Sequence, residues 1–524
     1  MLGKIAIFGA GVGGLTAAHY LADFAESIDI YEKNPTAGGL ARTEVSGSGS
    51  TSGSGECDTK EISWRVYFHF YNSLFEIMKN IPSYDRRPVT DHLVAYKNVF
   101  TPPIDPFSFM TINQILKIIR TIASSKSRID SYDNIPWRDF IGSDDAEIPQ
   151  WLGMDRFKGS TTSVQRIGIE QHLRKTKGIE DYVLDGPTNY VWFDPWVLEL
   201  KKRGVRFHFN SEVKEIYVDD KKITGAKVIP EGQVNADIYI IGLPVEALAK
   251  LLGGLAPTSL KLSGISRQIQ IAFQLHLSVP KGISFGKDHD GSEYQSFLVR
   301  KSPWAIIVES KTISWSKNTD LSRCKSTQWS ITACQTNVPG ILNGKTLMES
   351  TEKEAQDEII AEILDSKAAI KRLKDNNVDL NIEKILKEGR WATPFSSFKF
   401  ADGNTLLSTT EPKFSNNIGT KALRPSIILG PNAFLSTAYT KETIDVFSME
   451  AAAISGKAVA DFLIGGRGKM RVVLPPRPYG DGTIEGFRNI DEVLFCFGLP
   501  DILMSMFIVG VILILYWGLK RFKR

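Results

Sequence analysis

Four glycines near the start of the chain have the spacing of a phosphate-binding turn. Gly9, Gly11 and Gly14 fit the pattern G-x-G-x-x-G, which here follows a short apolar run and opens a helical pattern. Gly9 permits a tight turn, Gly11 lets the backbone approach a diphosphate, and Gly14 lets the helix lie close to the preceding strand. The helix start offers free N–H groups and the positive end of its dipole to an anion. The predicted turn comprises Gly9, Gly11, Val12, Gly13 and Gly14.

An acidic residue stands where such a turn would place a ribose. A second strand is expected from Ile28 to Tyr31, and Glu32 follows it, at the distance of about 20 residues that is typical of dinucleotide-binding folds. The carboxylate of Glu32 can accept hydrogen bonds from ribose hydroxyls, and Lys33 lies beside it. Strand, helix, second strand and acid together predict a βαβ unit that binds a dinucleotide.

A second glycine motif follows directly. Residues 34–42 read Asn-Pro-Thr-Ala-Gly-Gly-Leu-Ala-Arg. With the first turn, this segment resembles the superfamily of flavin amine oxidases and carotenoid or terpenoid (phytoene) desaturases. The resemblance implies that FAD is the cofactor, and that Gly38, Gly39, Leu40 and Arg42 lie against its phosphates and ribityl chain.

The resemblance recurs along most of the globular part. Residues 188–196 resemble the start of the strand pair that returns to the FAD domain, and residues 236–244 resemble a strand that closes it. Val213 stands where the family's backbone touches adenine. A late helix start resembles the segment whose backbone amides meet the flavin pyrimidine edge, and its residues are Ser448, Met449 and Glu450.

The loop before that late helix departs from the family pattern, in which a glycine is followed by an acid that binds the ribityl chain or a phosphate. The candidate loops are residues 430–432 and 436–439, and neither contains an acid. The departure leaves open weaker flavin binding or loss of the cofactor. It also leaves open a non-catalytic binder of prenylated partners, such as the Rab GDP-dissociation inhibitors that resemble this fold.

The substrate class follows from the resemblance rather than from a catalytic motif. A flavin performs the chemistry itself, so no catalytic residue is predicted. The aromatic segment from Trp64 to Tyr71 looks like the desaturases that accept an isoprenoid in an apolar tunnel, although ordinary helix packing also explains it. Amine oxidases carry a tyrosine where this chain has Ser448.

The leading hypothesis is an FAD-dependent oxidoreductase that moves hydride from a C–H bond of a small, apolar, isoprenoid-like substrate to flavin. A flavin amine oxidase and a redox-neutral flavin mutase remain alternatives. The electron acceptor stays open between oxygen, a quinone and a soluble carrier.

Composition excludes other partners. A formal net charge of +4 over 524 residues, with basic residues dispersed, does not favour nucleic acid. Four scattered cysteines and seven histidines without ligand spacing predict no metal site and suit a reducing compartment.

An apolar stretch near the C-terminus predicts a membrane partner. From Ile502 to Leu519 the chain has no charge, and Lys520 and Arg521 follow. Eighteen residues of helix span about 27 Å, enough for a bilayer core. We expect a single-pass C-terminal anchor in a membrane, with the catalytic part facing the cytosol. The helical pattern from Phe107 to Ile122 is compatible with a core helix or a second membrane-touching surface, and a core helix is predicted.

The expected fold class is α/β: a Rossmann-like FAD/NAD(P)-binding domain, an interleaved α+β substrate domain and a transmembrane helix. One long charged helix is also expected from Lys353 to Lys374. The predicted divisions are residues 1–63, 201–264 and 425–464 for the FAD domain, 64–200 and 265–424 for the substrate domain, 465–491 for a linker and 492–524 for the anchor.

Overall fold

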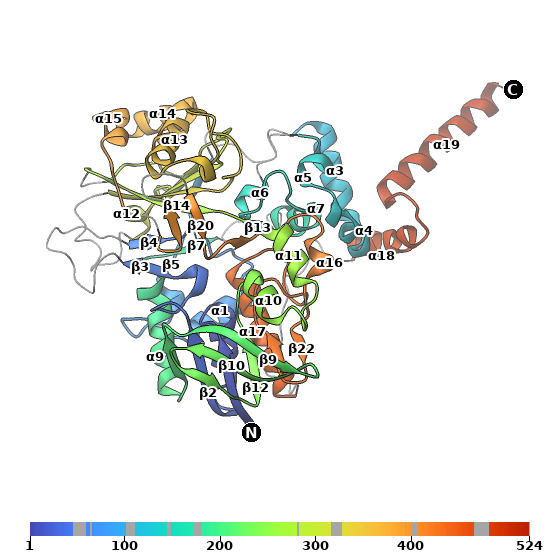
Figure 1. Ribbon diagram of the computed structural model, residues 1–524. Helices are drawn as coiled ribbons and strands as arrows, with labels where there is room; N and C mark the ends of the chain where they lie inside the picture. Colours follow the sequence, from blue (N-terminus) through green and yellow to red (C-terminus); the bar gives the residue numbers. More distant parts are fainter. Residues whose placement is uncertain are drawn as a thin grey trace. The chain divides into compact units, whose positions relative to one another are not determined.

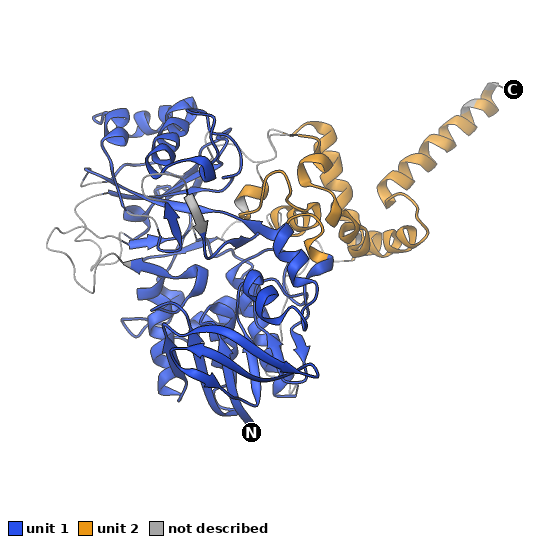
Figure 2. Cartoon of the chain, in the orientation of Figure 1, with its two compact units in different colours: residues 1–104, 178–415, 422–474 blue, residues 105–177, 416–421, 475–524 orange. Residues whose placement is uncertain are grey.

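The structure is a computed structural model, and it divides the chain into two compact units. Unit 1 comprises residues 1–104, 178–415 and 422–474, and unit 2 comprises residues 105–177, 416–421 and 475–524 (Figure 2). This division by compactness differs from the functional domains predicted above, which stay predictions. The described residues are 1–45, 59–62, 65–100, 110–143, 148–171, 180–279, 282–315, 327–392, 395–400, 406–465 and 482–522.

Unit 1 contains a six-stranded sheet whose central strands are parallel, as the βαβ pattern predicts. Its middle strand β1 reads Leu-Gly-Lys-Ile-Ala-Ile-Phe, and its last four residues are buried. Such continuous apolar runs are typical of parallel strands covered on both faces. The strands, in spatial order, are β22 (Ile428–Gly430), β23 (Ala433–Leu435), β12 (Ile238–Ile241), β1 (Leu2–Phe8), β2 (Ala25–Glu32) and β8 (Arg206–Phe209).

Two layers cover this parallel sheet (Figure 1). On one face helix α1 (Val12–Leu21) contacts β1, β2 and β12, and α17 (Met449–Leu463) lies against α1. On the other face the apolar side of a three-stranded antiparallel sheet joins a common core with Phe8 and Tyr31. That small sheet is formed by β9 (Glu212–Asp219), β10 (Lys222–Ile229) and β11 (Gly232–Val234).

A second six-stranded sheet lies in the same unit. All its neighbouring strands are antiparallel except β15 and β6, which run parallel. One face carries an extensive apolar core, including Phe273, Trp329 and Val308. The strands, in spatial order, are β18 (Arg390–Trp391), β14 (Ile271–Leu277), β17 (Thr327–Ala333), β16 (Ile306–Ser310), β15 (Ser296–Leu298) and β6 (Asn98–Phe100).

Three helices cover the apolar face of this second sheet: α13 (Glu352–Asp365), α14 (Lys367–Asn376) and α15 (Ile382–Lys387) (Figure 1). The single helix predicted from Lys353 to Lys374 is wrong, because Ser366 separates two helices. Ser366 has extended backbone angles, and its side chain accepts a hydrogen bond from the N–H of Ala369. A serine that caps a new helix outweighs continuous helical periodicity.

Unit 2 is helical. It contains α3 (Ile112–Ala123), α4 (Lys126–Ser131), α5 (Trp137–Ile141), α18 (Thr483–Cys496) and α19 (Ile502–Phe522). Helix α18 begins inside the range 465–491 that composition predicts as a linker, and residues 466–481 of that range lie outside the described part. Residues 107–109 of the predicted helix before α3 lie outside it as well.

Helix α19 is the one described helix that is long and apolar enough to cross a bilayer. The remaining helices and strands are short: β3 (Thr43–Val45), β4 (Thr59–Glu61), α2 (Asn72–Lys79), β5 (Leu93–Ala95), α6 (Ile148–Trp151), α7 (Thr161–Ser163), β7 (Tyr182–Leu184), α9 (Asp194–Lys202), α10 (Val245–Leu252), α11 (Ser259–Ser266), β13 (Arg267–Gln268), α12 (Lys311–Ser314), β19 (Phe398–Phe400), β20 (Leu406–Thr409), β21 (Lys413–Phe414) and α16 (Thr420–Leu423).

Candidate functional site

The predicted glycine turn lies between the end of β1 and the start of α1. Gly11 is the N-cap residue of α1, and no side chain caps this helix start. Val12, Gly13 and Gly14 form its first turn and are buried, and that turn contains no acid. A buried helix start without a side-chain cap leaves backbone N–H groups available to an anion.

Three of the four glycines are required by the fold itself. Gly9 has a φ of +104°, which disfavours other residues. A Cβ atom on Gly13 would lie 2.1 Å from the carbonyl oxygen of Ser436, and one on Gly14 would lie 2.2 Å from that of Gly9. These close contacts bring the loop at Ser436 and strand β1 against the first turn of α1.

Gly11 differs from the other three. Its φ is −75°, an ordinary value for any residue. Among the described residues, a Cβ atom added there would have one heavy atom within 4 Å, the Cα of Gly39 at 4.0 Å. The packing of the chain therefore does not require glycine at this position.

Glu32 is the last residue of β2, and its side chain contacts the glycine turn. Its carboxylate accepts hydrogen bonds from the N–H of Ala10 at 2.8 Å and from the N–H of Asn34 at 2.9 Å. Burial raises the pKa of Glu32, and the two backbone hydrogen bonds oppose that rise. The N–H of Ser211 donates to the Glu32 carbonyl oxygen at 2.8 Å, which brings the start of β9 and Val213 toward the same strand end.

The second glycine motif lies against the first. The N–H of Gly38 donates to the carbonyl oxygen of Ala10 at 2.9 Å. Gly38 and Gly39 both have positive φ values, +115° and +56°. A Cβ atom on Gly39 would lie 3.2 Å from the Cα of Gly11, so the two motifs meet backbone to backbone.

Arg42 is 2% exposed and forms a two-pronged ion pair with Glu411, with N–O distances of 3.0 and 2.9 Å. Burial would raise the pKa of Glu411, but hydrogen bonding and charge from Arg42 outweigh it and hold that pKa below its usual value. Lys33 is a second cation near Glu411, at 3.3 Å. The sequence analysis missed Glu411, since 369 residues separate it from Arg42.

The loop without an acid carries two buried hydroxyls instead. In the described part of the chain, Ser436 Oγ has no hydrogen-bond partner, whereas the Thr437 hydroxyl lies beside that of Tyr439. The Ser436 hydroxyl lies 3.0 Å from where a Cβ atom on Gly13 would stand, so it faces the start of α1. Buried hydroxyls usually have partners, and the Ser436 hydroxyl is positioned to bind a polar group beside the glycine turn.

The late helix start forms as predicted. Ser448 is the N-cap of α17, and its side chain accepts from the N–H of Ala451 at 3.2 Å. Met449 begins the helix. The Glu450 carboxylate, fully buried, accepts from the N–H groups of Ser73 and Leu74 at the start of α2. Burial raises the pKa of Glu450 to about 7. Its side chain thus joins α17 to α2.

The second sheet presents a buried polar face opposite its apolar core. Gln274 on β14 donates from Nε2 to Ser330 Oγ on β17 at 3.1 Å, and the buried Gln274 Oε1 has no partner among the described residues. Gln328 donates to the carbonyl oxygen of Thr59 at 2.8 Å. Further buried polar residues of this sheet are His276, Glu309, Ser296 and Thr332.

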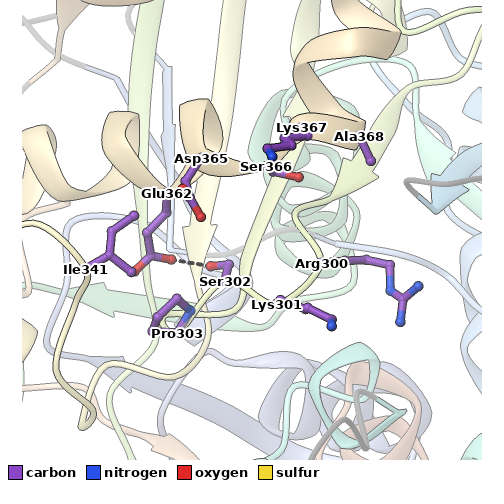
Figure 3. Close-up of a pocket in the computed structure, with 10 residues that line it drawn as sticks. All are labelled: Arg300, Lys301, Ser302, Pro303, Ile341, Glu362, Asp365, Ser366, Lys367 and Ala368. Atoms are coloured by element: carbon purple, nitrogen blue, oxygen red, sulfur yellow. Dashed lines mark hydrogen bonds between the residues drawn. The ribbon is translucent and has the colours of Figure 1, made fainter.

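A pocket of about 260 Å³ opens elsewhere in unit 1 (Figure 3). Glu362 reaches it and accepts hydrogen bonds from the hydroxyl of Ser302 and the N–H of Trp304. Burial, followed by the nearby Glu358, raises the pKa of Glu362 to about 8. None of the residues predicted to bind a cofactor lines this pocket, which is therefore not the candidate site.

Known proteins share parts of this chain. A family model described as an NAD(P)-binding Rossmann-like domain matches residues 7–79. The 15-cis-phytoene desaturase of Synechococcus elongatus is 23% identical over 291 residues, which cover 48% of this chain and 59% of the desaturase. The zeta-carotene desaturase of Arabidopsis thaliana is 25% identical over 308 residues, which cover 48% and 52%. The chain thus spans somewhat more than half the length of these relatives.

Solved structures match over a longer range. The structure of a putrescine oxidase bound to putrescine aligns with a TM-score of 0.57 and 14% identity, over 88% of this chain and 99% of the oxidase. At that identity the match shows the fold alone. It confirms the predicted fold class, a mixed α/β fold with a Rossmann-like domain. These similarities agree with the resemblance to flavin amine oxidases and carotenoid desaturases that the sequence carries.

Proposed function

We propose that this chain is an FAD-dependent oxidoreductase that removes hydride from a C–H bond of an apolar, isoprenoid-like substrate bearing at least one hydrogen-bonding group. The observation that carries the proposal is the open space beside the Cα atom of Gly11, where a side chain would fit. The fold does not need glycine there, whereas a diphosphate that approaches the backbone does.

The residues present fit the diphosphate and ribose of FAD. The start of α1 supplies backbone N–H groups, and Ser436 supplies a buried hydroxyl that has no partner among the described residues. Anions at a helix start gain from the dipole as well as from the hydrogen bonds. These donors compensate for the acid that the loop lacks relative to the family pattern.

Several of the predicted residues then have a role. Glu32 accepts from ribose hydroxyls while its bonds to Ala10 and Asn34 fix its orientation. Arg42 holds Gly39 by donating to its carbonyl oxygen at 3.0 Å, and Glu411 holds Arg42. Val213 borders adenine, and Met449 begins the helix that meets the flavin ring. FAD, when bound, supplies the hydride acceptor.

The buried polar face of the second sheet is our choice for the substrate. A buried carbonyl oxygen such as Gln274 Oε1 costs free energy unless a donor meets it. A pure hydrocarbon offers no donor. We therefore assign to the substrate a hydroxyl, amine or similar group that reaches this face, attached to an apolar body.

We also propose that α19 is a membrane anchor with the rest of the chain on the cytosolic side. The described part of α19 is almost wholly exposed, because only 6% of the residues in its apolar segment are buried. An exposed apolar helix of this length is stable in a bilayer and unfavourable in water. Protection of a C-terminal tag from protease in sealed vesicles would test this orientation.

Anaerobic reduction tests the substrate class. The full chain, purified in detergent and loaded with FAD, is mixed without oxygen with a hydroxylated polyene, a hydrocarbon polyene or a polyamine. We expect the visible flavin absorbance to bleach with the hydroxylated polyene. Bleaching by the hydrocarbon alone would remove the role of the polar face.

A flavin amine oxidase is the second candidate, because the same polar face suits an amine. Bleaching by the polyamine and by neither polyene would establish it in place of the leading proposal. Absence of bound flavin under all conditions would instead favour the non-catalytic binder.

A further inference from the structure

Helix α3 is amphipathic, but its apolar residues do not all enter a core. Ile118 is buried in a small cluster of unit 2, whereas Ile112, Leu116 and Ile119 are 76%, 52% and 45% exposed. Their spacing of four and three residues places all three on one side of the helix. The core helix predicted from the sequence therefore also has an uncovered apolar side.

Helix α18 has a matching feature. Ile490, Val493 and Phe497, again three and four residues apart, are 52%, 57% and 77% exposed. Opposite them Asp491 is fully buried. Two neighbouring helices of the same unit thus each expose an apolar stripe.

The base of α19 is fixed to both helices. Arg120 of α3 donates from Nε to Asp501 at 2.9 Å, and Asp501 accepts from the N–H of Met504 in the first turn of α19. Asp491 of α18 accepts from Arg128 at 3.0 Å and from the N–H of Ile502 at 3.1 Å. These carboxylates join α3, α4, α18 and α19 within unit 2.

The short distance from both stripes to the start of α19 favours the membrane as the surface that covers them. Phe497 precedes Asp501 by four residues, so at most about 14 Å of extended chain separates them. Asp501 would stand at the membrane surface if α19 crosses a bilayer from Ile502. Ile119 adjoins Arg120, which touches Asp501. The polar zone on each side of the hydrocarbon core is about 5–8 Å thick. The stripes therefore begin within reach of the membrane surface.

The charge of α3 favours the same occupant. Residues 110–127 include Lys117, Arg120 and Lys126 and no acid. A helix with an apolar side and only cationic charges is typical of helices that lie in a membrane interface rich in anionic lipid.

We propose that the exposed stripes of α3 and α18 form a lipid face that enters the boundary between headgroups and acyl chains of the bilayer that α19 crosses. This inference rests on the proposed anchor. The lipid face consists of Ile112, Leu116, Ile119, Ile490, Val493 and Phe497. It adds a second, interfacial contact to the single helix.

Fluorescent labels in the full chain test the lipid face. The four cysteines are replaced by serine, and one cysteine is introduced by Leu116→Cys, Val493→Cys or Phe497→Cys and labelled with the environment-sensitive dye NBD. The chain is reconstituted into vesicles of phosphatidylcholine and phosphatidylserine. Ile512→Cys on α19 reports on the anchor, and Val378→Cys, an apolar residue of unit 1 that is 82% exposed, is the matched control.

We expect labels on the lipid face to shift to the blue, to be quenched by brominated lipid and to be protected from aqueous iodide, unlike the label at position 378. Quenching by iodide to the extent seen at position 378, with position 512 still in lipid, would overturn the lipid face and leave the anchor intact. Position 512 outside lipid would overturn the anchor and the lipid face together.

Protection of the face labels from both quenchers would mean that protein covers the stripes, which also overturns the proposal. Each labelled chain must keep the thermal unfolding midpoint of the unlabelled protein. A position that fails this requirement is replaced by Ile119→Cys or Ile490→Cys on the same stripe.

Discussion

The two six-stranded sheets of unit 1 are both buried, yet they place polar groups in different ways. The parallel sheet is apolar through its centre, as in Ile5, Ile7 and Phe8 of β1. Its polar functions lie at one end, in backbone N–H groups and in Glu32. The second sheet carries side-chain polar groups across a whole face, as in Gln274 and Ser330.

This difference separates two tasks. A diphosphate is common to every dinucleotide, so backbone groups at a helix start can bind it. A substrate has to be distinguished from similar molecules, which requires side chains that differ from protein to protein. We infer that cofactor affinity depends on the first sheet and substrate choice on the second.

The largest expected effect is on flavin content. Gly11→Val places a branched side chain where the diphosphate would lie, so the variant should lose nearly all bound flavin and all activity while it stays folded. Absorbance of the purified protein measures the flavin and circular dichroism the fold. Gly264→Ala is the control, since a Cβ atom there meets no atom of the described residues within 4 Å. A Gly11→Val protein with full flavin content would contradict the first half of the comparison.

The next effect is on stability. Glu411→Ala removes the two-pronged partner of buried Arg42 and leaves it the ion pair with Glu44 at 3.1 Å, so we expect a loss of about 2–3 kcal/mol in the free energy of unfolding. Denaturant unfolding of the full chain in detergent measures it. Glu411→Gln keeps an acceptor for Arg42 and should lose less. Equal losses in both variants would show that the charge of Glu411, and not its bonding to Arg42, matters.

A smaller effect is expected at the polar sheet face. Gln274→Met keeps the size of the side chain and removes its hydrogen-bonding groups, so kcat/KM should fall about 10-fold to 100-fold, equivalent to about 1–3 kcal/mol. Flavin content should not change, because the residue belongs to the other sheet. The comparison fails if the variant loses flavin, or if it keeps full kcat/KM with a substrate that bears a hydroxyl.

The smallest effect concerns pH. The pKa of Glu362 is raised to about 8 in the folded chain, against 4.5 as its usual value. The folded state therefore holds a proton that the unfolded state releases, and this group lowers stability progressively from about pH 4.5 to 8. Glu362→Gln should weaken the fall in thermal unfolding midpoint over that range. An unchanged pH profile would mean that Glu362 is not protonated at neutral pH.

The sequence predicts the first sheet better than the second, for a physical reason. The turn from Gly9 to Gly14, strand β2 and Glu32 are set by residues close together in the chain, so local patterns reveal them. The partners Glu411 and Ser436 meet that turn only through the folded chain.

The second sheet could not be assembled in the same way. Its strands range from Asn98 to Trp391, and alternation of apolar and polar residues does not say which strands pair. The break at Ser366 was hidden for a related reason, because helical periodicity continues through it. The exposed stripe of α3 likewise has the pattern of a core helix, and only the packing of unit 2 shows it uncovered.

The ratio of flavin to protein tests the central claim most directly. The full chain is purified in detergent, incubated with excess FAD, freed of unbound flavin, and its visible spectrum is compared with its protein content. The account predicts a yellow protein with close to one flavin per chain. A colourless protein, folded by circular dichroism yet without flavin after this treatment, would contradict it.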